Sequence, residues 1–208
     1  MKFGVLYDFR NPPTSEWFTP WPEFYAGALE HMQEMERLGF DTISLAEHHG
    51  DPEGYNPSMP VTLTAAAMRT QRVRICSNII QLPLYHPVLL AEQLAVLDIL
   101  SNGRLDVGIG QGGQTFDMEW SMLGLNPKHR PGRFEEGLEI LRRCWTEEEP
   151  FAFQGKHWDL DGVWLNPKPL QQPHPPTFVV AVFSAKAMDR VARMGFDVGG
   201  WGGFFTGL

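Results

Sequence analysis

Residues 73–109, VRICSNIIQLPLYHPVLLAEQLAVLDILSNGRLDVGI, decide the fold class of this 208-residue chain. The apolar run over 73–80 predicts a buried strand. Pro87 begins a segment in which leucines recur at helical spacing, and the run at 104–109 predicts a second buried strand. A strand, a helix and a strand in this order predict two parallel strands joined by a right-handed crossover.

The same alternation continues in both directions and chooses between two architectures. The first four predicted strands start near residues 2, 42, 73 and 104, at separations of 40, 31 and 31 residues. A (β/α)8 barrel averages about 31 residues per unit. A doubly wound sheet is the alternative, but it would carry a glycine-rich turn after its first strand, and residues 8–13, DFRNPP, contain no glycine. We therefore predict an α/β fold of the (β/α)8 TIM-barrel type.

The chain is expected to form one domain over residues 1–208, a partial barrel that ends after about six strands. Residues 150–176, rich in proline and tryptophan, predict a small inserted hairpin, and residues 115–130 predict a long loop. An open parallel sheet exposes unpaired edge groups, so we expect a homo-oligomer that covers the edge. The expected strands are 2–7, 42–45, 73–80, 104–109, 177–181 and one that begins at 196. Two helices are expected to begin at residues 22 and 87, and three more are expected over 60–70, 133–145 and 185–194.

The composition excludes several classes of protein. Twenty-five acidic against 17 basic residues give a net charge of −8, which argues against a nucleic-acid-binding surface. No apolar run approaches the roughly 18 residues of a membrane span, and the N-terminus turns polar after Tyr7, unlike a signal peptide. Cys76 and Cys144 lack the spacing of a metal site and predict free thiols in a reducing cytoplasm.

The triplet Glu47-His48-His49 directly follows the second predicted strand, where barrel enzymes place catalytic groups. Adjacent residues on an extended segment point to opposite sides, so His48 and His49 are not expected to face one ligand together. General acid or base catalysis by an imidazole is one interpretation, and a hydrogen-bonded surface histidine is another. A metal site would need further converging ligands, for which the sequence offers only Asp8 and His86, and we predict none.

The sequence Gly108-Ile109-Gly110-Gln111-Gly112-Gly113 matches G-x-G-x-x-G after a predicted strand. No helix is expected to open at its last glycine, which disfavours dinucleotide binding. Two interpretations remain: a glycine-rich turn at a barrel rim, or a backbone that a flat or phosphorylated ligand approaches closely. Ser184, at a predicted helix start, is an N-cap or a phosphate contact.

Taken in order, several short motifs resemble those of the bacterial luciferase-like flavin monooxygenases. Each is weak alone, but together they run through almost the whole chain. The matching residues are Leu38-Gly39-Phe40-Asp41, Ala46-Glu47-His48-His49, Leu82-Pro83, His86-Pro87, Leu97-Asp98, Leu100-Ser101-Asn102-Gly103-Arg104, Gly108–Gly112, Asn166-Pro167-Lys168-Pro169, Gln172-Pro173 and Pro175-Pro176.

This resemblance implies a barrel that binds reduced FMN at its C-terminal mouth and activates dioxygen to oxygenate a small organic molecule. A separate flavin reductase is the implied partner. His48 is the implied acid or base, and a non-prolyl cis peptide bond is implied at Asn78-Ile79. The resemblance also implies two alternatives: a deazaflavin-dependent dehydrogenase, and a short flavin-binding protein without turnover. The implied cofactor contacts are Ser77, Asn78, Ile79, Gly110, Gln111, Gly112, Ser184 and Ala185.

Overall fold

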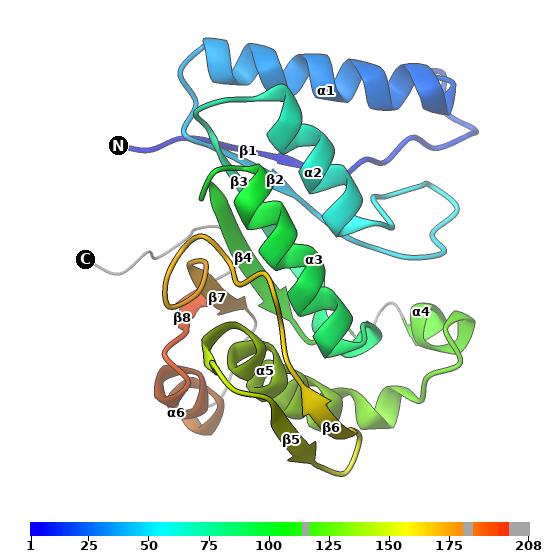
Figure 1. Cartoon of the computed structure of the whole chain (residues 1–208). Helices are drawn as coiled ribbons and strands as arrows, with labels where there is room; N and C mark the ends of the chain where they lie inside the picture. The colour runs from blue at the N-terminus through cyan, green and yellow to red at the C-terminus, as the bar shows by residue number, and fades with distance from the viewer. Residues whose placement is uncertain (114–116, 181–184, 200–208) are drawn as a thin grey trace.

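The computed structural model describes residues 1–113, 117–180 and 185–199. Its main element is a six-stranded parallel sheet with the strand order β1-β2-β3-β4-β7-β8 (Figure 1). The strands of this sheet therefore lie side by side in the same order in which they occur in the sequence. This order is that of a barrel wall, because a doubly wound sheet reverses its strand order. The prediction of an α/β fold of the barrel type is confirmed. The strands are β1 (Gly4–Tyr7), β2 (Thr42–Leu45), β3 (Arg74–Gln81), β4 (Leu105–Gly110), β7 (Thr177–Val180) and β8 (Asp197–Gly199).

Helices cover the outer face of this sheet. Figure 1 shows α2 and α3 side by side in front of the strands, with α5 next along the wall. The apolar residues of β2, β3 and β4 that point outward are fully buried beneath these helices, as are the leucines on the inner side of α3. Burial of this apolar surface is the main source of stability of such a layer. The helices are α1 (Trp21–Arg37), α2 (Met59–Arg69), α3 (Pro87–Leu100), α5 (Arg130–Thr146) and α6 (Ala185–Arg193).

The segment expected to be a long loop contains helical structure, so that prediction was wrong. Asp117–Met122 form the short helix α4, and Pro127–His129 form a turn of 3-10 helix that leads into α5. Trp120 is completely buried and anchors α4. The Asn126 side chain accepts a hydrogen bond from the backbone N–H of Lys128 and caps the second turn. Six residues are too few to show a helical period, which is why the sequence pattern missed α4.

A separate two-stranded antiparallel sheet, β5 (Phe151–Gln154) and β6 (Asp159–Val163), forms a hairpin within residues 150–176. Its turn is fixed to α5, because the Glu136 carboxylate accepts hydrogen bonds from the backbone N–H groups of residues 156, 157 and 158. The guanidinium of Arg133 also lies over the Trp158 ring, 4.5 Å from its centroid. The hairpin is therefore attached to the outside of the sheet layer, through α5.

Within the described residues the sheet is open, with β1 and β8 at its two edges. No helix in this part of the chain is long and apolar enough to cross a bilayer. Cys76 and Cys144 are both free and buried, and burial raises the pKa of the Cys144 thiol to about 12. Neither thiol is a reactive thiolate at neutral pH.

Candidate active site at the carboxyl ends of β2, β3 and β4

The two histidines after β2 are held by two different buried carboxylates. The Nδ1 atom of His48 lies 3.0 Å from Oε1 of Glu119, and the Nε2 atom of His49 lies 3.3 Å from Oε1 of Glu47. Both carboxylate side chains are fully buried, whereas the His48 side chain is 23% exposed. The two rings therefore contact different carboxylates.

Glu119 brings α4 to the end of β2. Its Oε1 atom also accepts the backbone N–H of His49 at 2.8 Å, so one oxygen fixes both the ring of His48 and the chain beside it. Burial alone would raise the pKa of Glu119, but the hydrogen bonds from His48 and the His49 backbone, together with the nearby Gln81 amide, outweigh it and lower that pKa. Glu119 is therefore ionised at neutral pH and accepts the hydrogen bond from His48.

Glu47 is the centre of the second network and ties β2 to the end of β3. Its Oε2 accepts the Tyr85 hydroxyl at 2.7 Å, and its Oε1 accepts the backbone N–H of Gln81 at 3.1 Å. Burial would lower the pKa of His49, yet the hydrogen bond and charge of Glu47, with the charge of Glu119, raise it above its ordinary value. Burial and the adjacent Glu47 raise the pKa of Tyr85. All three partners of Glu47 are thus donors at neutral pH.

The end of β3 carries an irregularity between these two networks. The register of β3 with β4 shifts between Ser77 and Ile80, and the Asn78–Ile79 peptide bond inside this shift is cis. The cis bond that the resemblance implied is therefore present. Asn78 and Ile79 are partly exposed, while their neighbours on both sides are buried. These two residues are therefore accessible to a ligand at the carboxyl end of β3.

Ser77 directly precedes these two residues on β3 and is fully buried. Its hydroxyl donates to the carbonyl of Gly108 and accepts the N–H of Gly108, both at 2.9 Å. The side chain therefore connects β3 to β4, and its role as a cofactor contact stays a prediction.

Gly110, the last residue of β4, and Gly112, two residues after it, are explained first by packing within the chain. A Cβ atom on Gly110 would lie 2.0 Å from Cδ1 of Ile79, and one on Gly112 would lie 2.3 Å from Oε1 of Gln81. Gly112 also has a φ of +78°, which favours glycine. Gln111 and Gly112 are partly exposed at the same end of the sheet as His48. The structure thus supports the interpretation as a tight rim turn, and close approach of a ligand stays a prediction.

Two predicted contacts follow β7. Ser184 lies outside the described residues, and Ala185 is the first residue of α6. Among the described residues, no group of three His, Cys, Asp or Glu side chains is arranged to hold a metal ion. Glu119 and Gln81 were missed by the sequence analysis, because neither belongs to a motif and Glu119 is 71 positions from His48.

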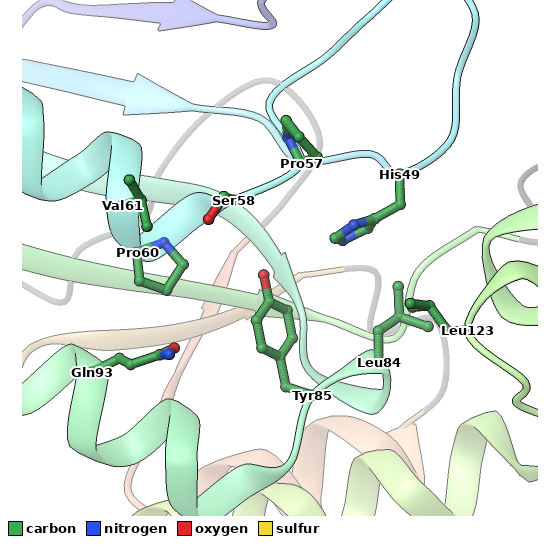
Figure 2. A pocket seen from close by; sticks show the side chains of 9 residues that line it. All are labelled: His49, Pro57, Ser58, Pro60, Val61, Leu84, Tyr85, Gln93 and Leu123. Carbon is green, nitrogen blue, oxygen red and sulfur yellow. The ribbon is translucent and has the colours of Figure 1, made fainter.

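One pocket of about 240 Å³ opens beside the Glu47 network (Figure 2). Figure 2 shows the rings of His49 and Tyr85 at this pocket, with Ser58 and Pro60 at the start of α2 across from them. His48 is not among the residues that line this pocket, whereas His49 is. The two histidines therefore differ in their surroundings: His49 lines this pocket, and His48 is paired with Glu119.

Comparison with known proteins identifies the family. A family model described as luciferase-like monooxygenase matches residues 1–204. The oxygenase component of flavin-dependent trigonelline monooxygenase from Acinetobacter baylyi is 31% identical over 159 residues, which are 76% of this chain and 44% of that protein. The crystal structure of monooxygenase RslO1 from Streptomyces bottropensis has a TM-score of 0.86 and 32% identity, over 95% of this chain and 59% of that one.

Two solved structures with lower identity share the fold. The oxygenating constituent of 3,6-diketocamphane monooxygenase from Pseudomonas putida, in complex with FMN, has a TM-score of 0.80 at 21% identity, over 96% of this chain and 57% of that one. An F420-dependent secondary alcohol dehydrogenase has a TM-score of 0.70 at 22% identity, over 86% of this chain and 52% of that one. Proteins of this fold therefore include users of FMN and users of F420.

The chain spans about half the length of the curated relatives it matches, since it covers 44%, 44% and 48% of three of them. This chain itself contains the parallel strand order, the cis peptide bond in β3 and the two histidines after β2 that are described above. Because the family model matches residues 1–204, the chain belongs to the luciferase-like monooxygenase family.

Proposed function

We propose that this chain carries the site of a flavin-dependent monooxygenase that uses reduced FMN and dioxygen to oxygenate a small organic molecule such as an aldehyde or a ketone. The observation that carries the proposal is the pairing of His48 with ionised Glu119 after the end of β2. A carboxylate-oriented imidazole can give and take a proton near pH 7.

The residues of the mouth fit a flat flavin ring. Asn78 and Ile79 offer a partly exposed backbone surface, Gln111 and Gly112 form a partly exposed turn on the neighbouring strand, and the edge of His48 is exposed. Ligands of barrel enzymes bind at this end of the strands, often with phosphate groups at the loops after later strands. We propose that Ser184 and Ala185 contact the FMN phosphate, as the start of a helix can, and that Gly110 completes the turn.

Each residue then has a defined task. Bound reduced FMN supplies two electrons to dioxygen. His48 exchanges a proton with the ligand through Nε2, because its Nδ1–H is engaged by Glu119. Glu119 orients the ring through this contact. Glu47 accepts hydrogen bonds from Tyr85, His49 and the backbone of Gln81, and it keeps the end of β3 in place.

Other partners and the organisation of the chain follow from the same proposal. The relative named as an oxygenase component supports a separate flavin reductase that delivers reduced FMN. Exposed apolar side chains support a homo-oligomer: Phe3 just before β1, Leu6 on β1, Met68 on α2 and Leu89 on α3. We also propose that residues 1–208 act as one partial barrel domain, located in the cytoplasm.

The experiment compares cofactors directly. The chain is mixed under nitrogen with reduced FMN or with reduced F420, oxygen is admitted, and absorbance, oxygen consumption and product are followed with small aldehydes and ketones. We expect tight binding of reduced FMN and product that matches the oxygen consumed. Oxidation of secondary alcohols with F420, which the F420-dependent structure favours as the second candidate, would contradict the proposal. Re-oxidation of FMN at the rate of free FMN, without product, would instead indicate a flavin-binding protein without turnover.

A further inference from the structure

Gln81 is a buried polar residue that the proposed mechanism does not yet use. It is the last residue of β3 and only 2% exposed. In the part of the chain that the structure describes, neither Nε2 nor Oε1 of its amide makes a hydrogen bond of standard geometry. A buried amide without a partner costs free energy, so a residue of this kind is usually retained for a purpose.

The nearby Glu119 carboxylate has one oxygen atom that lacks a hydrogen-bond donor among the described residues. Oε1 of Glu119 accepts from His48 and from the His49 backbone, whereas Oε2 makes no hydrogen bond of standard geometry with any described residue. The Gln81 amide lies close enough to this carboxyl group to contribute to its lowered pKa. Gly112 leaves the space that the amide occupies, because a Cβ there would lie 2.3 Å from Oε1 of Gln81.

We propose that Gln81 is a positioning residue whose amide N–H serves the second oxygen of Glu119 and thereby holds His48 in the tautomer with its proton on Nδ1. This inference rests on the function proposed above for His48. The other charged groups around Glu119 are His49 and, next to His49, Glu47. An ionised carboxylate only accepts hydrogen bonds, so Nδ1 of His48 must carry the proton and Nε2 is left as an acceptor.

Loss of the amide would change this arrangement. A buried Glu119 with fewer donors takes up a proton more readily, because desolvation penalises its charged form. A protonated Glu119 can donate to Nδ1 of His48, and the ring proton then moves to Nε2. The ring would change from an acceptor to a donor at the atom assigned to the chemistry.

The test uses the flavin-free chain labelled with 15N-histidine. The ring nitrogens of His48 are assigned among the seven histidines by their loss in His48→Gln. We expect Nε2 of neutral His48 to resonate as an unprotonated nitrogen in the wild type and to move toward the protonated position in Gln81→Met. Gln93→Met, at an exposed position on α3, is the matched control and should leave the signals unchanged. If Gln81→Met does not fold, Gln81→Asn serves, since it keeps an amide but withdraws it from Glu119.

A second readout is the pH profile of turnover. In Gln81→Met the acid limb should move up by about one pH unit while the KM for substrate stays unchanged. Unchanged His48 nitrogen signals in Gln81→Met, or in Gln81→Asn where only that variant folds, would overturn the inference. Because these signals are measured without flavin, a failure of FMN binding would sink the proposed function and leave the result for Gln81 standing.

Discussion

The two buried carboxylates at the mouth hold neighbouring histidines in different ways. Glu47 uses both oxygens and accepts hydrogen bonds from His49, Tyr85 and the backbone of Gln81. Glu119 uses one oxygen, and it holds the more exposed of the two rings. A saturated network fixes the framework, whereas an unsaturated one leaves a group whose protonation can change. The comparison teaches that two adjacent histidines can have different roles, one in holding the structure together and the other in the proposed chemistry.

The largest effect should come from breaking the saturated network. Glu47→Ala leaves three donors without an acceptor in a buried site, and we expect the free energy of unfolding to fall by about 3 kcal/mol or more. Urea denaturation followed by circular dichroism measures it. The matched control is Glu34→Ala, which removes an exposed carboxylate paired with Arg37 on α1 and should leave the midpoint unchanged. Equal midpoints for Glu47→Ala and the wild type would end the framework assignment.

A smaller change to the same network is Tyr85→Phe. It removes the hydroxyl that donates to Oε2 of Glu47 at 2.7 Å and keeps the ring. We expect a loss of about 1–2 kcal/mol, the cost of one hydrogen bond to a buried charged group. Tyr25→Phe is the control, since the Tyr25 hydroxyl makes no hydrogen bond in the described part of the chain. A loss no larger than that of the control would show that Glu47 does not need this donor.

The smallest expected effect is a pH dependence of stability. The folded-state pKa of His49 is raised, so its stabilisation is fully present below its unfolded pKa of about 6.5 and is lost as the pH rises through the folded value. We expect the melting temperature to fall as the pH rises above about 6.5, and to fall less in Glu47→Gln, which lacks the charge that raises the pKa of His49. Identical slopes in the two proteins would assign the effect to other groups.

The fold was largely readable from the sequence, because strand and helix signals were long and well bounded. Thr42–Leu45 and Pro87–Leu100 match their expected spans, and the proline at the start of α3 explains why that boundary was clear. The short α4 was not readable, because its only strong signal was one buried tryptophan, Trp120. Local patterns predict elements, but they do not predict which side chain from a distant loop meets them.

The candidate site was readable only in part for the same reason. His48 and the cis bond at Asn78–Ile79 lie at strand ends, where the fold itself directs attention. Glu119 comes from the short helix α4, 71 positions away, and a single carboxylate there has no periodic signature. The rim glycine Gly110 suggested room for a ligand, whereas the structure shows the side chain of Ile79 in that space.

The most direct test of the central claim compares His48→Ala with His49→Ala in one assay. Turnover is measured with reduced FMN, dioxygen and the best substrate, and melting temperature is measured on the same preparations. We predict that His48→Ala lowers turnover by about a hundredfold or more with little change in melting temperature, and that His49→Ala lowers the melting temperature more and turnover less. Full coupled oxygenation by His48→Ala would contradict the assignment of the two histidines.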